Sequence, residues 1–354
     1  MLVFVTGASG YIGLHIVDQL LQAGHTVKGT ARGDKFTNLK AAYADTPAFE
    51  AVEIADIGSG SLAPLLQGVD AIIHTAAPLG GRVSFEESQR YATEGGVHII
   101  REAYKAGVRR AVVTSSIATF PNDAWNGPYG HKDFPEVTVD EAKADMYKGY
   151  VYQKTSVDKS VIAFAEAHPE MKVVILAPVW TLGPQAPKYT QIIPKRNVLA
   201  LATQVFLLTI ITSDGSFYTW SPGAIDVRDV ARVHIRALSV TPATDANWGR
   251  YLIASPEPYS WKGAIQLLKE KRPELLGRLA DPAGAPDWPE NENRVRLSKE
   301  EKEEQDWLFG VKREGVESTG DVWGYRSAEE MVLDGVDNLL EIERVWDQNA
   351  SNEN

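Results

Sequence analysis

The sequence opens with an apolar segment that runs directly into a glycine-rich turn. Residues 2–6 are Leu-Val-Phe-Val-Thr, and residues 7–13 are Gly-Ala-Ser-Gly-Tyr-Ile-Gly. Apolar side chains at helical spacing follow, so the pattern predicts a strand, a tight turn and a helix. Glycines let the backbone approach a pyrophosphate, and the helix N-terminus offers free N–H groups. The pattern therefore predicts a dinucleotide site at Gly7, Ser9, Gly10, Tyr11, Ile12 and Gly13.

Apolar strand-like segments alternate with helix-period segments throughout the first half of the chain. This alternation predicts an α/β fold with a Rossmann-type, doubly wound parallel sheet. Beyond about residue 178 the alternation loosens. We expect a dinucleotide-binding domain of residues 1–177 and about 223–240, and a smaller, partly interleaved C-terminal substrate domain of about 178–222 and 241–345. Residues 346–354 are predicted to be a frayed tail.

Composition narrows the function classes. The 36 Lys and Arg residues against 47 Asp and Glu give a net charge of −11, which disfavours nucleic acid as a partner. With no cysteine, thiolate, iron–sulfur and disulfide chemistry are absent, so redox chemistry must come from a cofactor. The apolar segment 198–212 is too short to span a membrane. With no metal motif among the seven histidines and no leader segment, we expect a cytoplasmic protein without a metal.

The end of the second predicted strand bears on the choice of dinucleotide. A carboxylate there would accept from the ribose 2′-hydroxyl and repel a 2′-phosphate. The chain instead has Arg32, with Lys35 nearby, and both could bind a phosphate. We predict NADP(H) in preference to NAD(H). The alternative is that Arg32 is a solvated loop charge, which the neighbouring Asp34 favours.

Two more segments follow predicted strands, at the sheet edge where an open α/β sheet binds ligands. Asp56 and Ile57 come after the third strand and are expected beside the adenine. Thr75, Ala76 and Ala77 come after the fourth, and their small side chains let a cofactor lie close.

A tyrosine and a lysine occupy one face of a predicted helix. Tyr150 and Lys154 are four residues apart, about one helical turn. A nearby ammonium favours the phenolate, so Lys154 is expected to lower the pKa of Tyr150, which can then shuttle a proton. Tyr147 and Tyr152 are alternatives, but neither has a lysine four residues later. An exposed helix face with no function would show the same spacing.

Hydroxyl side chains end the strand that precedes this helix. Residues 114–119 are Thr-Ser-Ser-Ile-Ala-Thr. One of these hydroxyls could hold a substrate carbonyl oxygen beside the phenol. The alternative is that they only cap the end of the strand.

Taken together, these motifs resemble the extended short-chain dehydrogenase/reductase family, also called the NAD-dependent epimerase/dehydratase superfamily. The similarity is greatest to its dihydroflavonol reductase, cinnamoyl-CoA reductase and fungal aldehyde (methylglyoxal) reductase branch, through Arg32 and residues 114–116, 177–184 and 226–234. The resemblance implies that Ser116, Tyr150 and Lys154 are catalytic, with Lys154 also bonding the nicotinamide ribose.

The resemblance also implies that the segment containing Pro178 and Thr181 lines the nicotinamide. The chain departs from the family at Ala92, where many relatives have an asparagine that serves a proton relay.

The leading hypothesis is an NADPH-dependent carbonyl (aldehyde or ketone) reductase, an oxidoreductase in which Tyr150 protonates the substrate oxygen. A nucleotide-sugar epimerase or dehydratase with bound NAD is the alternative, with Lys188, Lys195 and Arg196 available for a diphosphate. A non-enzymatic dinucleotide sensor is the third hypothesis. We expect a small, mostly apolar or aromatic carbonyl substrate, while the sequence leaves monomer and homodimer open. The predicted substrate-lining residues are Phe85, Ile117, Phe120, Tyr189, Phe206 and Trp220.

Overall fold

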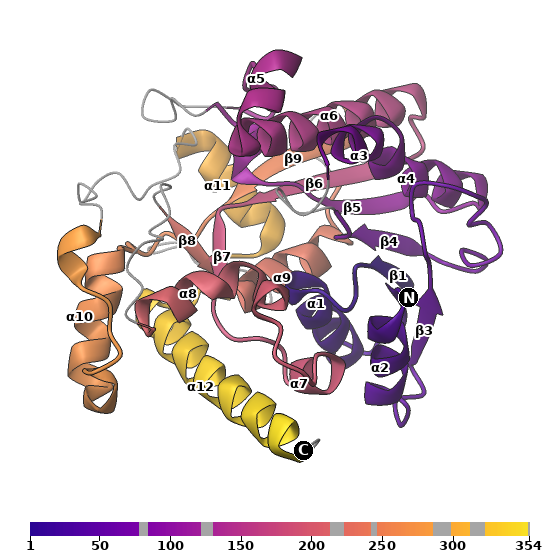
Figure 1. Cartoon of the computed structure of the whole chain (residues 1–354). Helices are drawn as coiled ribbons and strands as arrows, with labels where there is room; N and C mark the ends of the chain where they lie inside the picture. The colour runs from indigo at the N-terminus through magenta and orange to yellow at the C-terminus, as the bar shows by residue number, and fades with distance from the viewer. Residues whose placement is uncertain are drawn as a thin grey trace.

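The computed structural model describes residues 1–77, 84–121, 130–212, 223–241, 246–285, 299–311 and 323–352. A parallel sheet with helices on both faces forms its centre (Figure 1). Its seven strands lie in the order β3-β2-β1-β4-β5-β6-β9. They are β1 (Leu2–Thr6), β2 (Thr26–Ala31), β3 (Phe49–Glu53), β4 (Ala71–His74), β5 (Arg110–Thr114), β6 (Lys172–Pro178) and β9 (Trp248–Ile253). The predicted Rossmann-type α/β fold is confirmed.

The strand order reverses direction between β1 and β4. Thr6, at the end of β1, pairs in register with His74, at the end of β4. Ligands of open α/β sheets bind in the crevice outside the carboxyl ends of the strands at such a reversal. The predicted site residues of the first domain follow these strand ends.

Side chains on each strand alternate between two hydrophobic clusters. Along β1, Val3 and Val5 belong to one cluster and Phe4 to the other. The first cluster lies against α1 (Tyr11–Gln22), α2 (Asp34–Ala42) and α9 (Val227–Ala237). The second lies against α4 (Gly96–Lys105) and α6 (Met146–Ala167). Two short helices, α3 (Phe85–Arg90) and α5 (Val139–Ala144), precede α4 and α6.

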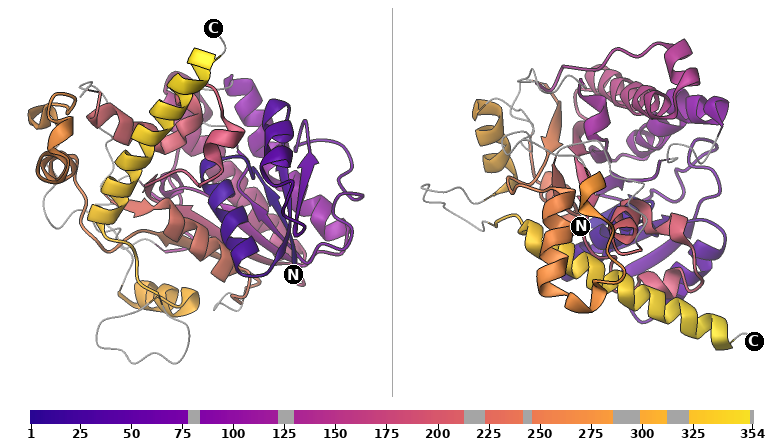
Figure 2. Two further views of the ribbon diagram at one scale, coloured as in Figure 1. Left: turned by 90° about the horizontal axis from the view of Figure 1, so that it is seen from below. Right: turned by 60° about the vertical axis from the view of Figure 1, so that its left-hand side comes forward.

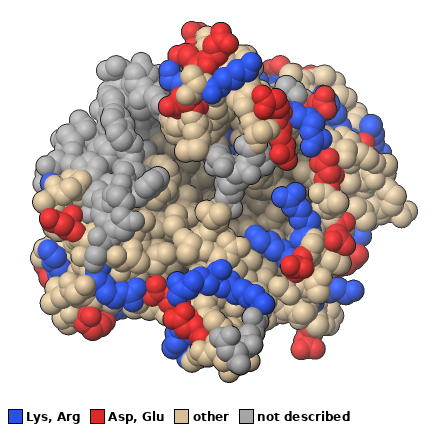
Figure 3. Space-filling model, viewed as in Figure 1, with Lys and Arg blue, Asp and Glu red and all other residues tan. Residues whose placement is uncertain are grey.

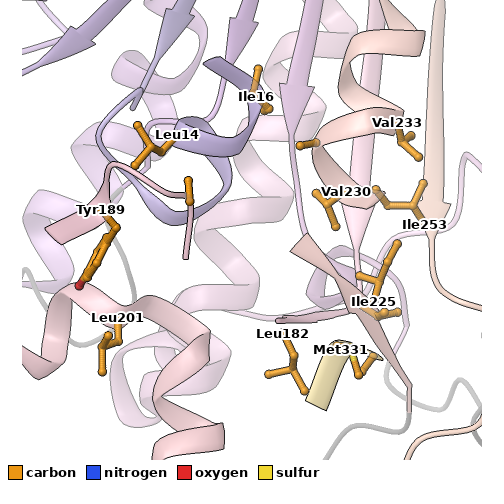
Figure 4. Packing of buried hydrophobic residues seen from close by; sticks show 14 of the residues in the cluster. Leu14, Ile16, Leu182, Tyr189, Leu201, Ile225, Val230, Val233, Ile253 and Met331 are labelled. Atoms are coloured by element: carbon orange, nitrogen blue, oxygen red, sulfur yellow. The ribbon is translucent and has the colours of Figure 1, made fainter. Parts of the chain in front are cut away.

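A second lobe packs against the first cluster. It contains a two-stranded sheet and the remaining helices of the described chain. These are β7 (Trp180–Leu182), β8 (Ala224–Asp226), α7 (Tyr189–Ile192), α8 (Val205–Ile210), α10 (Trp261–Lys271), α11 (Lys299–Phe309) and α12 (Ala328–Asn352). Figure 4 shows the shared core, where Leu14 of α1 and Val230 of α9 lie in one cluster with Leu182 and Met331.

Two predicted boundaries are corrected. Residues 248–253, assigned to the second domain, form β9 and pair with β6 in the central sheet. The tail predicted at 346–354 is instead helical as far as Asn352, because α12 packs on α7 and α8 (Figures 1 and 2). Trp346 is 2% exposed, and its indole N–H donates to the Ile193 carbonyl at 2.8 Å.

The apolar segment 198–212 folds into a 3-10 turn (Val198–Gln204) followed by α8. In the described part of the chain, no helix has the length and apolar character that crossing a membrane requires.

Candidate active site

Close packing explains the glycines of the turn between β1 and α1. Gly7 has φ +70°, and a Cβ there would lie 2.7 Å from Thr75 Oγ1. A Cβ on Gly13 would lie 2.1 Å from the Gly7 carbonyl oxygen. Gly10 is exposed at the tip of the turn, and its N–H donates to the Gly7 carbonyl at 2.9 Å. The turn therefore keeps its backbone open at the N-terminus of α1, where a pyrophosphate would bind.

The side chains of the predicted Tyr11 and Ile12 face the protein. The Tyr11 hydroxyl donates to the Gly183 carbonyl at 2.8 Å, and Ile12 packs on the first hydrophobic cluster. One turn later, His15 Nε2 donates to the Pro184 carbonyl at 2.9 Å. These bonds join the glycine turn to the second lobe, so Tyr11 and Ile12 offer a ligand their backbone only.

Arg32 lies exposed after β2, and no other described residue forms a hydrogen bond or an ion pair with it. Lys35 is half-buried on α2. The sequence analysis missed the carboxylate of Glu53 beside Arg32 and Lys35, because Glu53 lies on the neighbouring strand β3. Glu53 pairs in register with Ala31, and its Oε1 accepts from the Gly33 N–H at 3.2 Å.

Asp56 shapes its own turn. Its carboxylate accepts from the Gly58 N–H at 2.9 Å and from the Ser59 hydroxyl at 3.0 Å, and it pairs with Arg90 at 3.4 Å. These contacts, with the Gly58 bond the largest, hold the pKa of Asp56 below its ordinary value. Ile57 packs on the second hydrophobic cluster.

A hydrogen-bonded network that the sequence analysis missed holds the segment 74–77. His74 is buried, with Nδ1 2.7 Å from Thr6 Oγ1 and Nε2 3.1 Å from the Tyr91 hydroxyl. The Tyr91 hydroxyl donates to the Ala76 carbonyl, and Thr75 Oγ1 donates to the Thr6 carbonyl at 2.7 Å. Burial, together with the charge of Lys154, lowers the pKa of His74 to about 3, so the ring is neutral. The network fixes the backbone of Thr75 and Ala76 beside the glycine turn.

The structure brings Ser116, Tyr150 and Lys154 together at the end of β5. Ser116 begins the 3-10 turn Ile117–Thr119 and accepts from the Ala118 N–H at 3.2 Å. Its hydroxyl is near enough to the Tyr150 phenol to lower the pKa of that phenol. Lys154 is 8% exposed, and Nζ donates to the Thr114 carbonyl at 3.0 Å. Of the hydroxyls at 114–119, Ser116 is the one that acts on the pKa of Tyr150 among the described residues.

The pKa of Tyr150 differs from the prediction. Burial raises it above its ordinary value, the Ser116 hydroxyl opposes this rise, and the charge of Asp158 adds to it. Burial lowers the pKa of Lys154, while Asp158 opposes that change. The net shift of the Tyr150 pKa is therefore upward, opposite to the lowering expected from Lys154, because burial of the phenol is its largest cause.

The alternative tyrosines lie elsewhere. Tyr147 is 46% exposed. Tyr152 lines a surface cavity with Thr138 and Lys159, and neither Ser116 nor Tyr150 contributes to that cavity.

The predicted substrate residues separate into two groups. Phe120 and Tyr189 are 3% and 4% exposed and belong to the core, which corrects their placement on a pocket wall. Ile117, beside Ser116, is half-buried, as are Phe85 and Phe206. Trp220 lies outside the described residues.

The segment expected to line the nicotinamide leads from β6 into β7. Pro178 ends β6 and pairs in register with Ile253, and Thr181 is buried, with its hydroxyl donating to the Val179 carbonyl at 3.2 Å. Between them, the ring of Trp180 lies edge-on to Phe206, with 4.9 Å between ring centroids.

Figure 3 shows the face that carries these strand ends. It is hollowed at its centre, below α5 and α6, and the described residues that line the hollow are mostly neither acidic nor basic. No cluster of three or more His, Cys, Asp or Glu side chains suited to a metal ion occurs within the described ranges.

Comparison with known proteins identifies the family. The NAD dependent epimerase/dehydratase family matches residues 3–250. An NADPH-dependent methylglyoxal reductase of Saccharomyces cerevisiae is 26% identical over 348 residues, covering 91% of this chain and 96% of that protein. Cinnamoyl-CoA reductase 1 of Arabidopsis thaliana is 30% identical over 292 residues, covering 77% and 75%.

The fold of a solved relative agrees. The crystal structure of yeast methylglyoxal/isovaleraldehyde reductase complexed with NADPH superposes with a TM-score of 0.79 at 23% identity, over 98% of this chain and 100% of that one. The resemblance inferred from the motifs is confirmed, and the chain belongs to the NAD dependent epimerase/dehydratase family.

Proposed function

We propose that the protein is an NADPH-dependent reductase of aldehydes or ketones, with Tyr150 as proton donor, Ser116 orienting the substrate oxygen and Lys154 stabilising the charge that Tyr150 acquires. The observation that carries this proposal is the placement of the three side chains at the carboxyl end of β5. The Ser116 hydroxyl is near enough to the Tyr150 phenol to affect its pKa, and Lys154, one turn further along α6, donates to the Thr114 carbonyl at 3.0 Å. Sequence similarity to reductases described as NADPH-dependent or as acting on carbonyl compounds supports it.

The glycine turn fits a dinucleotide. Cβ atoms at Gly7 and Gly13 would collide with Thr75 and with the Gly7 carbonyl oxygen, so only glycine lets the turn close this tightly against the segment after β4 and the start of α1. Backbone N–H groups at the start of α1 would hold the pyrophosphate. Bound NADPH would supply the hydride.

Three side chains take part in the proposed proton transfer. Tyr150 has a raised pKa, so its phenol carries a proton at neutral pH and can give it to a substrate oxygen. The Ser116 hydroxyl, which is near enough to the Tyr150 phenol to affect its pKa, can donate to the same oxygen. After the transfer, the Lys154 ammonium and the Ser116 hydroxyl would stabilise the Tyr150 phenolate.

The proposed preference for NADPH rests on Arg32. Its exposed guanidinium, without a partner among the described residues, is available to a 2′-phosphate at the end of β2. Glu53 is the nearest competing feature, since its carboxylate already accepts from the Gly33 N–H. We assign the preference to Arg32 because Glu53 lies on β3 and caps the turn.

The proposed substrate is apolar or aromatic. Ile117 is half-buried beside Ser116, and Phe206 packs on Trp180 in the segment that follows β6. Side chains of this kind bury apolar surface of a ligand.

The basic residues considered for a sugar nucleotide have other partners. Lys188 donates to the Ala42 carbonyl and lies 4.5 Å from the centroid of the Tyr43 ring. Arg196 pairs with Asp347 at 3.0 Å. These contacts favour the reductase over a nucleotide-sugar epimerase or dehydratase. A sensor without chemistry would not need the Ser116, Tyr150 and Lys154 arrangement.

The test is loss of NADPH absorbance in the presence of a panel of aromatic and aliphatic aldehydes and ketones. We expect turnover by the wild type and by Tyr152→Phe, a matched control on the same helix, and a loss of at least about 100-fold in Tyr150→Phe. Normal turnover by Tyr150→Phe would overturn the assignment of the proton donor. Absence of turnover by the wild type with every carbonyl compound would overturn the function.

A further inference from the structure

A buried ion pair lies directly behind the proposed catalytic residues. Asp158 follows Lys154 by four residues and Tyr150 by eight, so all three share one face of α6. Its carboxylate is 3.3 Å from Nε of Arg250, which comes from β9. Both side chains are inaccessible, at 1% and 0% exposure. Neither residue was identified by the sequence analysis.

Arg250 is fixed on every side. Nη1 donates to the carbonyls of His131 and Asp133, at 3.3 and 3.0 Å. Nη2 donates to the Thr119 carbonyl and, at 2.8 Å, to the Thr119 hydroxyl. The guanidinium carbon lies 3.8 and 4.0 Å from the ring centroids of Phe120 and Phe134. A guanidinium held in this way cannot turn from Asp158 without losing several buried hydrogen bonds.

Asp158 in turn holds the turn that carries Ser116. Its Oδ2 accepts from the Ser115 hydroxyl at 2.6 Å. At the other end of the turn, the Thr119 hydroxyl donates to the Ser116 carbonyl at 2.9 Å. Asp158 is therefore hydrogen-bonded to Ser115 and Arg250 to Thr119, so the pair holds the turn on both sides of Ser116. The second oxygen of Asp158, Oδ1, is buried and has no hydrogen-bond partner.

A buried ion pair is weak evidence for stability, because removing two charges from water costs free energy that their attraction only partly returns. The position of this pair beside the site therefore says more about its role than does the presence of a buried ion pair. Asp158 is hydrogen-bonded to the hydroxyl turn and lies one helical turn from Lys154, an ammonium that burial disfavours.

We propose that Asp158 is a positioning residue of the catalytic site, whose carboxylate, held by Arg250, keeps the buried Lys154 ammonium charged and fixes the turn that presents Ser116. The proposal deepens the proposed function and rests on it for the roles of Ser116 and Lys154.

The charged and titratable groups around the pair come from α6, β9, β4 and the segment that precedes α5. Tyr150 and Lys154 are on α6 with Asp158, Arg250 is on β9, and His74 is on β4. Asp133, before α5, acts on Arg250, while the turn after β5 contributes hydroxyls only. His74 is neutral above pH 4, so it adds no charge near neutrality. The carboxylate of Asp158 is thus the negative charge that acts on Lys154, and it also opposes ionisation of Tyr150.

Asp158→Asn removes this charge with little change of shape. The matched control is Asp229→Asn on α9, another buried carboxylate, which accepts from Nη1 and the backbone N–H of Arg326, far from Tyr150 in sequence. Asp158→Glu is the conservative variant that keeps the carboxylate.

The first readout is the stability of the protein without NADPH between pH 7 and 10.5. Because the native pKa of Lys154 lies below its unfolded value, the native state binds fewer protons between the two, and stability rises with pH there. In Asp158→Asn, the free energy of unfolding should begin to rise at a pH about one to two units lower than in the wild type and in Asp229→Asn. The second readout is the alkaline limb of the kcat profile, which should move to lower pH in the same direction.

Asp158→Glu should restore both profiles at least in part. If Asp158→Asn does not fold, the double variant Asp158→Asn/Arg250→Met replaces the pair by uncharged groups, and a smaller shift in the same direction is expected because the Arg250 cation is removed as well. The proposal is overturned if the Asp158→Asn stability profile, or that of the double variant, coincides with that of Asp229→Asn. The stability profile gives this answer even if the wild type reduces no carbonyl compound, so failure of the proposed function is distinguished from failure of this inference.

Discussion

Ala202 carries backbone strain that a single substitution should release. It has φ 54° and ψ −132°, and it is the only residue other than glycine with positive φ in the described part of the chain. Such a conformation costs an L residue about 1–3 kcal/mol. The surrounding contacts impose it, since the Thr203 hydroxyl donates to the Thr181 carbonyl and Gln204 Nε2 donates to Asn338 Oδ1 at 3.0 Å.

Ala202→Gly should therefore stabilise the protein. Glycine removes the strain but adds about 0.5–1 kcal/mol of conformational entropy to the unfolded chain, which leaves a net gain of about 0.5–2 kcal/mol. At about 2 cal/mol/K per residue, this corresponds to a rise in Tm of about 1–3 °C for the whole chain.

The assay is thermal and urea unfolding of Ala202→Gly beside Ala200→Gly. Ala200 lies in the same 3-10 turn but not at positive φ, so its substitution should lose about 0.5–1 kcal/mol. The two variants should move in opposite directions. Equal destabilisation by both would refute the argument that strain is stored at Ala202.

Three further predictions concern the cofactor, acid stability and the C-terminal helix. Arg32→Ala should raise the Kd for NADPH about tenfold and leave that for NADH unchanged, measured by nicotinamide fluorescence; an equal change for both would exclude contact with the 2′-phosphate. Because the native pKa of His74 is about 3, the stability it contributes is present above pH 6.5 and is lost as the pH falls from there toward 3. His74→Gln should reduce the slope of unfolding free energy against pH in this window by about 1.4 kcal/mol per unit, and an unchanged slope would mean that the ring titrates normally. Trp346→Ala should lose about 3–5 kcal/mol by urea unfolding, because it removes a 2% exposed indole and its bond to Ile193; a loss below 1 kcal/mol would mean that the end of α12 is not docked.

Local patterns predicted the strand, turn and helix that open the chain. The turn from β1 to α1 is encoded in consecutive residues, and the glycines at 7 and 13 are required by contacts within that turn and with Thr75. The spacing of Tyr150 and Lys154 is likewise set by one helix. What depends on neighbouring strands was missed: Glu53 comes close to Gly33 only through the pairing of β2 with β3.

Long-range contacts account for the other omissions. Asp158 and Arg250 are 92 residues apart, and β9 was assigned to the wrong domain. A signal was nevertheless present, because Asp158 continues the four-residue spacing of Tyr150 and Lys154. The sequence could not separate core aromatics such as Phe120 from pocket aromatics, since both are apolar and both follow the same elements.

The error at the C-terminus had a local cause. Polar residues dominate the last stretch, and they suggested a frayed tail. The apolar positions Leu339, Ile342 and Trp346 nevertheless continue at helical spacing and are 1–2% exposed. Periodicity was the better guide there than composition.

The most direct test of the central claim is the fate of the transferred hydrogen. NADPH carrying deuterium at the transferable C4 position is incubated with the protein and a carbonyl compound that it turns over, and the alcohol is analysed by mass spectrometry and NMR. The account predicts one deuterium per molecule of alcohol, bound to the former carbonyl carbon, in the wild type and in Tyr152→Phe. Consumption of the cofactor with no deuterium at that carbon would contradict hydride transfer to the carbonyl group.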